Sequence, residues 1–255
     1  MPIAKTTITT QPQTNQFSFH ADANGSACRI DFTTDDNGNT KQLNLVSPVH
    51  GQVSLPVIGG IAQSQEPGSD AQFAEYFQHG PCATTAKGSL AADTAETEIH
   101  SHVSNLRVIN QPLPKQKIEA DTIEFQADLI QLGIQSTYQR GANPVFTLLE
   151  SDPVNMRIVY KMADKTSVFP VVVTIDPKLI GNSAAPASIV TGIKRGDMPL
   201  EPGHVLTIPG FGKLYFGEVV ASQFSRRVIM LRIALGCRTT GSVSLASVGQ
   251  NGVWN

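Results

Sequence analysis

The 255-residue chain carries little charge. Only 16% of its residues are charged, and the formal net charge is -2. Proteins that bind nucleic acid or anionic membranes usually present a clustered excess of Lys and Arg. The pairs Lys194-Arg195 and Arg226-Arg227 are too small to form such a cluster. We therefore expect no nucleic-acid partner.

Cysteine is also scarce, since Cys28, Cys82 and Cys237 are the only three and none forms a CxxC pair. Three widely spaced cysteines exclude a dense disulfide framework and allow at most one bridge. Isolated cysteines are most often buried and reduced. Reduced thiols are therefore the expectation, although the sequence alone does not decide the pairing.

The chain lacks long apolar runs as well. Residues 1–16 contain no apolar segment of the kind found in secretory signal peptides, and no later stretch is long enough for a membrane-spanning helix. These absences predict a soluble protein that is cytoplasmic or exported without a signal peptide. Residues 1–16 are rich in Thr and Gln, and we expect them to form a flexible tail.

What the sequence does contain is a succession of segments in which apolar and polar residues alternate, as they do in β-strands. Turn residues separate these segments, beginning with Asn24 and Gly25 and then residues 35–38. An Asn-Gly pair between two alternating runs predicts a hairpin turn. The pattern is clearest over residues 204–235, which we expect to form a central sheet. The predicted fold is mainly β, an antiparallel sandwich or barrel.

One short helix is expected near residues 70–79, with Phe73 and Phe77 on its inward side and Gly80 at its end. Residues 117–134 fit either a helix or a strand, and the surrounding β pattern favours the strand.

A single β-rich domain over residues 17–255 is expected, because sandwiches and barrels often reach this length as one unit. Residues 181–197 could also be an exposed connector.

Glu98, His100 and His102 form the strongest chemical pattern of the sequence. Alternate residues of a strand face the same side, so the three side chains would share one face. Two histidines and a carboxylate are typical ligands of a divalent transition metal such as zinc. A third histidine from another strand would complete the site, and the candidates are His50, His79 and His204.

The same residues are also explained as the solvent-facing side of a strand, and this interpretation is favoured. Ile99 and Val103 alternate with the histidines, so the apolar residues would take the inward side. Leu106, however, has the parity of the histidines, so the inward face must change after Val103. A β-bulge near Ser104 and Asn105 would produce that change.

His79 and Cys82 are a second candidate pair. A cysteine and a histidine form a nucleophile with its base when the two side chains meet in space and a third group orients the histidine. Gly80 and Pro81 between them are also explained by an ordinary turn.

The first functional hypothesis is a non-enzymatic binding or structural β-protein without a cofactor, which contacts a glycan or a protein partner through its loops. The alternative is a metal-dependent enzyme centred on Glu98, His100 and His102. A third and weaker hypothesis is a membrane-inserting β-hairpin within residues 83–110. The sequence indicates no catalytic residue and leaves the oligomeric state open.

Overall fold

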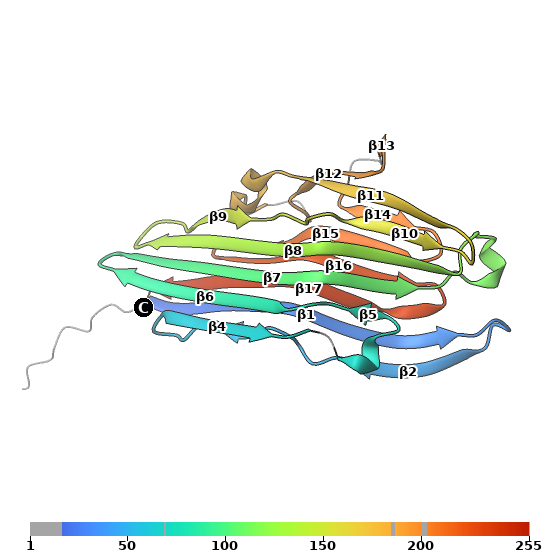
Figure 1. Ribbon diagram of the computed structural model, residues 1–255. Coiled ribbons are helices and arrows are strands. Elements are labelled where there is room, and N and C mark those ends of the chain that lie inside the picture. Colours follow the sequence, from blue (N-terminus) through green and yellow to red (C-terminus); the bar gives the residue numbers. More distant parts are fainter. Residues whose placement is uncertain (1–16, 69, 185–186, 200–202, 255) are drawn as a thin grey trace, which may run out of the picture.

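Two antiparallel sheets form the protein, as the computed structural model shows for residues 17–68, 70–184, 187–199 and 203–254 (Figure 1). The predicted mainly β fold is confirmed. The sheets form two packed layers, and within the described ranges neither closes into a barrel, so the sandwich alternative holds. The predicted flexible tail, residues 1–16, lies outside the described residues.

The seven-stranded sheet has the strand order β14-β15-β16-β17-β1-β2, and β3 pairs with β1. Residues 204–235, predicted to form a central sheet, supply the three consecutive strands β14, β15 and β16, which lie on one side of this sheet with β14 at its edge. The strands of this sheet are β1 (Phe17–Thr34), β2 (Thr40–Val46), β3 (Val53–Ser54), β14 (Val205–Ile208), β15 (Gly212–Ala221), β16 (Ser225–Gly236) and β17 (Thr239–Trp254).

The ten-stranded sheet has the order β13-β12-β11-β10-β8-β7-β6-β4, with β5 pairing β7 and β9 pairing β8. Its strands are β4 (Gly60–Glu66), β5 (Phe77–Gln78), β6 (Cys82–Ala91), β7 (Thr94–Asn110), β8 (Thr122–Gln139), β9 (Val145–Glu150), β10 (Arg157–Lys161), β11 (Thr166–Ile175), β12 (Val190–Arg195) and β13 (Met198–Pro199). The short 3-10 helices are η1 (Ala71–Phe73), η2 (Pro114–Gln116) and η3 (Pro177–Gly181).

The core lies between the sheets, where β1 packs on β6 and β7 and β17 packs on β7 and β8. Each long strand contributes alternate side chains to it, because successive residues point to opposite faces. Residues 122–134 belong to β8, so the strand interpretation favoured for residues 117–134 is confirmed from Thr122 onward. No helix in the described part of the chain is long and apolar enough to cross a membrane.

Both strands of the central β7–β8 pair change their inward face at the same point. In β7 the buried positions are odd-numbered up to Val103 and even-numbered from Leu106, and Asn105 between them has a left-handed φ of 50°. β8 changes face opposite Asn105, at Asp128, so the pairing register is the same on both sides. The predicted change of face is therefore confirmed. The predicted bulge is wrong, because neither strand carries an extra residue there.

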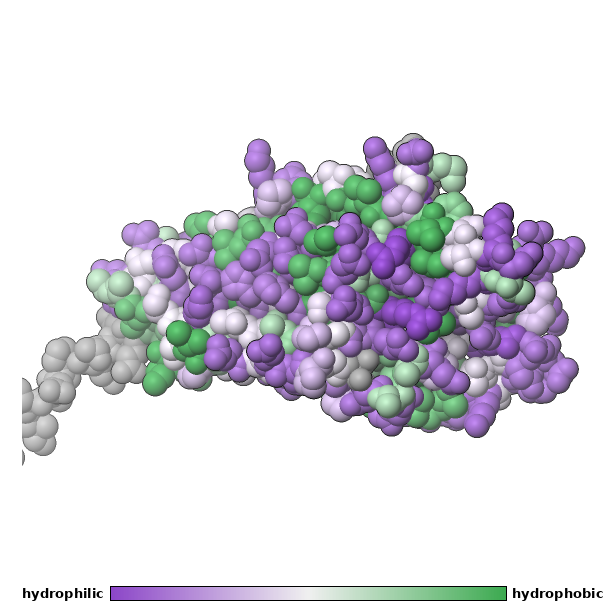
Figure 2. All heavy atoms as spheres, in the orientation of Figure 1, coloured by the Kyte–Doolittle hydropathy of each residue, from purple (hydrophilic) through white to green (hydrophobic). Residues whose placement is uncertain are grey.

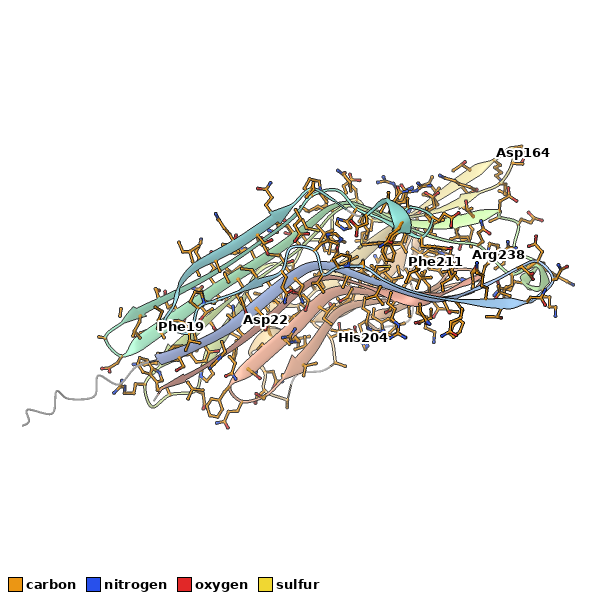
Figure 3. All side chains as sticks on the ribbon, turned by 90° about the horizontal axis from the view of Figure 1, so that it is seen from below. Phe19, Asp22, Asp164, His204, Phe211 and Arg238 are labelled. Atoms are coloured by element: carbon orange, nitrogen blue, oxygen red, sulfur yellow. The ribbon has the colours of Figure 1, made fainter. Side chains whose placement is uncertain are left out.

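The seven-stranded sheet also has a row of positions at which the regular strand pairing is interrupted. Gly217, Met230, Ala246 and Gly25 lie opposite one another in β15, β16, β17 and β1, and the regular pairing is interrupted at each of them. Gly217 and Ala246 have positive φ angles of 60° and 49°. We call these two lines of interrupted pairing the crease of the sandwich. β1 bends visibly in its middle (Figure 3).

The predicted hairpin turn at Asn24 and Gly25 is wrong, because β1 continues through both residues. Gly25 serves a close contact instead: a Cβ there would lie 2.8 Å from the Cβ of Cys82. The turn at residues 35–38 is confirmed, and the Asp35 carboxylate accepts the backbone N–H of Asn37 and of Asn39.

The helix predicted near residues 70–79 is only the single turn η1, and Phe77–Gln78 is strand β5. Phe73 and Phe77 are buried as predicted. Pairing with β7 provides partners for the backbone hydrogen-bonding groups of β5. A short isolated helix would instead have to bear an unfavourable nucleation free energy. Residues 190–195 of the considered connector form β12, which pairs with β11. The single-domain organisation stays a prediction.

The crease yields a test of stability. A β-branched residue is strained at a left-handed φ, so Asn105→Val should lower the free energy of unfolding by about 1–2 kcal/mol. Asn105→Gly, which relieves the strain, should change it by less than about 0.5 kcal/mol. Urea unfolding followed by circular dichroism measures both variants. Equal losses in the two variants would contradict the assigned backbone conformation.

Candidate metal centre

His100 and His102 lie on the outer face of the ten-stranded sheet. Ile99, Ser101 and Val103 between and beside them are buried in the core. The His100 side chain is 20% exposed and the His102 side chain 39%. Figure 2 shows this outer face, on which hydrophilic side chains predominate over β7 and β8. The strand therefore presents both imidazoles side by side on a rigid surface.

Glu150 joins the two histidines from β9. It is the last residue of that strand and pairs with Gly133 of β8, which pairs in turn with His100. The register of β8 and β9 shifts between Gly133 and Ile134, so that Leu149 is an extra residue in β9. Such a bulge re-aims the side chains beside it. Three neighbouring strands thus direct His100, His102 and Glu150 to one place.

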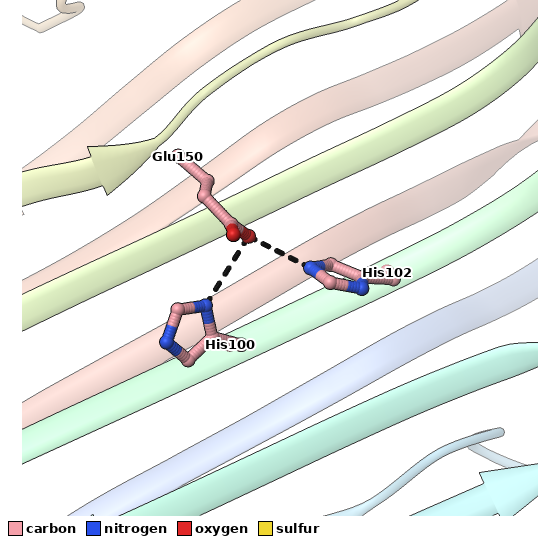
Figure 4. A group of neighbouring side chains, drawn as sticks. All are labelled: His100, His102 and Glu150. Carbon is pink, nitrogen blue, oxygen red and sulfur yellow. Dashed lines mark hydrogen bonds and ion pairs between the residues drawn. The ribbon is translucent and has the colours of Figure 1, made fainter.

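The Oε2 atom of Glu150 lies 3.2 Å from Nδ1 of His100 and 2.8 Å from Nε2 of His102 (Figure 4). One ligand atom from each of the three residues lies within 4.8 Å of the other two. A tetrahedral zinc ion with bonds near 2.05 Å would hold its ligand atoms about 3.3 Å apart. The group therefore needs only small side-chain movements to surround an ion.

Glu98 lies on the other side of His100. Its Oε1 atom is 2.9 Å from His100 Nε2, the nitrogen that does not face Glu150, and 3.2 Å from Nζ of Lys87. A carboxylate at the remote nitrogen of a metal-binding histidine fixes the ring orientation and makes the ligand more basic. Glu98 occupies the position of such an orienting residue.

Gly133 leaves room for the His100 ring. A Cβ at residue 133 would lie 2.8 Å from His100 Nδ1, so a larger residue would displace the imidazole. The hydrogen bonds from His102 and His100 hold the pKa of Glu150 below its ordinary value, and the hydrogen bond from His100 does the same for Glu98. Both carboxylates are therefore ionised at neutral pH, which is the form that binds metals.

The histidines considered as a third ligand lie elsewhere, and among the described residues only Glu150 joins His100 and His102. Glu150 is 48 positions from His102 in the sequence, so no local spacing connects the two. Only the pairing of β7, β8 and β9 brings them together. Comparisons with models of known protein families and with curated proteins give no match. The chemistry of this site is therefore inferred from its geometry.

The second candidate pair, His79 and Cys82, also meets in space. Cys82 Sγ lies 3.4 Å from His79 Nδ1, which is 2.6 Å from the carbonyl oxygen of Gly80, and Ser26 Oγ lies 2.9 Å from His79 Nε2. Cys82 and Ser26 are fully buried, however. Burial raises the pKa of the Cys82 thiol to about 11, so the sulfur stays protonated and a weak nucleophile. We interpret the group as a buried polar network at the crease, between β1 and β6.

A second histidine extends this network. His50 Nδ1 lies 2.8 Å from Oε2 of Glu66, and the His50 and His79 rings are 5.1 Å apart.

Cys28 and Cys237 are buried and free like Cys82, so the expected reduced thiols are confirmed.

The network predicts a loss of stability in acid. Burial is the main cause that lowers the pKa of His79 below its ordinary 6.5, so the unfolded chain binds the proton more tightly than the folded chain. The free energy of unfolding should therefore decrease as the pH falls from about 7 to about 5. His79→Gln removes this titration and should flatten the slope, measured by urea unfolding at each pH. His20→Gln, at an exposed histidine of β1, should keep the wild-type slope. Equal slopes for wild type and His79→Gln would refute the assignment.

Proposed function

We propose that this protein binds a divalent transition metal ion, zinc foremost, through His100, His102 and Glu150. The observation that carries the proposal is the convergence of two imidazole nitrogens and a carboxylate oxygen from β7 and β9. Imidazole and carboxylate ligands in this number suit zinc and neighbouring transition metals. The sequence predicted Glu98 as the carboxylate ligand, and the proposal assigns that role to Glu150 instead.

Preorganisation supports the proposal. Two histidines stand on one rigid strand, Glu98 orients one of them, and Gly133 leaves the space that this ring needs. Side chains that are already positioned lose little conformational freedom when the ion binds. Binding should therefore be tight although the site is on the surface.

Three protein ligands leave at least one position of a four-coordinate ion open. Here the open position would face solvent, because the His102 and Glu150 side chains are 39% and 36% exposed. A carboxylate or imidazole of a protein partner could occupy it. This role agrees with the non-enzymatic binding function that the sequence favours.

A metal-dependent hydrolase is the second candidate. Two histidines and one glutamate with an open position are also the ligand set of several catalytic zinc sites, in which the ion activates water. Hydrolysis of an activated ester by the zinc-loaded protein, lost in the His102→Ala variant, would favour this candidate over a pure binding role.

The metal site is tested by zinc titration calorimetry on untagged protein stripped with a chelator. The wild type should bind one zinc ion per chain, and His102→Ala should lose more than about 100-fold in affinity, because it removes a ligand. His20→Ala is the matched control, since it removes an exposed histidine of β1. A wild type that binds no zinc, or that binds it no better than a His100→Ala/His102→Ala variant, would overturn the proposal.

The Glu98→Gln variant tests whether Glu98 orients His100 or binds the zinc ion itself. As an orienting residue, Glu98 should contribute about 10–100-fold in zinc affinity, with the stoichiometry unchanged. Glu96→Gln is the control, because Glu96 lies on the same face of β7 and is exposed. An effect of Glu98→Gln as large as that of His102→Ala would make Glu98 a ligand, as the sequence pattern predicted. If Glu98→Gln lowers the zinc affinity no more than Glu96→Gln does, Glu98 does not orient His100.

A further inference from the structure

A pocket of about 600 Å³ lies beside the ends of β8 and β17. Both strands end at the same end of the sandwich, on the left in Figure 1. Three segments form it: residues 138–144, the turn between β15 and β16, and residues 251–254. Its volume lies within the range of about 300–1,000 Å³ that is usual for small-molecule sites. None of the residues of the metal centre lines it.

Aromatic rings form one part of the wall. Trp254 packs edge-to-face on Phe17 with the ring centroids 5.1 Å apart, and the Arg140 guanidinium lies 4.7 Å from the centre of the Trp254 ring. Tyr138 packs on the same Phe17 at 5.0 Å. Phe224, by contrast, is 49% exposed, so part of its ring is free for a ligand. Tyr138 is buried and supports the wall from below, so Trp254 and Phe224 provide the aromatic surface of the pocket.

Neutral amides form the other part. Gln139, Asn143 and Asn251 line the pocket, and the Gln223 side chain donates a hydrogen bond of 3.0 Å to Oδ1 of Asn143. That bond links the β8–β9 turn to the β15–β16 turn. The twelve residues of the lining include no charged side chain, and the Arg140 guanidinium beside Trp254 is paired with the Asp93 carboxylate at 3.4 Å. Amides offer both donors and acceptors, so they can bind hydroxyl groups of either orientation.

We propose that this pocket binds a neutral saccharide. A sugar ring has an apolar C–H face and a rim of hydroxyl groups, which match the aromatic rings and the amides respectively. An anionic ligand would require a cationic lining, and an alkyl chain would leave the amides without hydrogen bonds. This inference goes beyond the metal-binding function, and a failure of either leaves the other standing.

The composition of the chain provides a local reporter. Trp254 is the only tryptophan, so its fluorescence reports on this pocket alone. The full chain is titrated with the neutral hexasaccharides of cellulose, starch, xylan, laminarin and chitin, and with an anionic oligogalacturonate. At least one neutral oligosaccharide should change the emission saturably and release or absorb heat in calorimetry. The oligogalacturonate should do neither.

Phe224→Ala should weaken this binding by about tenfold, as truncation of a central aromatic contact usually does. Phe224 lies in an exposed turn, and an unchanged thermal melt verifies that the variant is folded. Phe32→Ala is the matched control, because Phe32 is 40% exposed on β1 and does not line the pocket. Absence of both signals with every neutral oligosaccharide, equal losses in the two variants, or binding of the oligogalacturonate as tight as that of a neutral sugar would overturn the proposal.

Discussion

The alternation of side chains along β7 is the constraint on which the core and the candidate metal centre both depend. A slip of one residue would turn His100 and His102 into the core and Ile99 and Val103 into solvent. The burial of Ile99 and Val103 opposes such a slip, because it removes large apolar side chains from water. Burial of the alternating apolar residues in the core therefore keeps the two imidazoles on the outer face of the sheet.

The crease makes this arrangement compatible with a long strand. Beyond Asn105 the inward face of β7 changes parity, and β8 changes with it, so Leu106 and Val108 remain in the core. The seven-stranded sheet has its own line of interrupted pairing, which includes Gly25. Backbones approach closely there, and the polar groups of Ser26 and His79 satisfy each other by hydrogen bonding. The network around Cys82 is accordingly buried between the sheets, whereas His100, His102 and Glu150 lie on the outer face of the ten-stranded sheet.

The sequence predicted those features that depend on local pattern. Alternating segments identified the β class, and the alternation of Ile99 and Val103 with the histidines identified the outward face of β7. Asn24 and Gly25 misled the prediction, because the same dipeptide suits a hairpin turn and a close packing contact. Phe73 and Phe77 have a spacing that fits a helix, but they reach the core from a turn and a short strand.

Features that depend on strand pairing could not be predicted from the sequence. Glu150 becomes a neighbour of His102 only through the register of β7, β8 and β9 and the bulge at Leu149. The pocket at the end of the sandwich likewise combines segments that lie far apart in the sequence, and its amides and aromatics follow no common spacing. The spacing of residues 98–102 predicts Glu98 as a ligand. It cannot show which nitrogen of His100 a carboxylate faces, so it does not distinguish a ligand from an orienting residue.

X-ray absorption spectroscopy of the zinc-loaded protein tests the metal centre most directly, with the Glu98→Gln and Glu150→Gln variants measured in parallel. We expect two imidazole nitrogens at about 2.0–2.1 Å and a carboxylate oxygen at about 2.0–2.2 Å from the ion. The spectrum should change in Glu150→Gln and keep the same ligand set in Glu98→Gln. A shell without imidazole scattering, or a spectrum that is indifferent to Glu150, would contradict a centre formed by His100, His102 and Glu150.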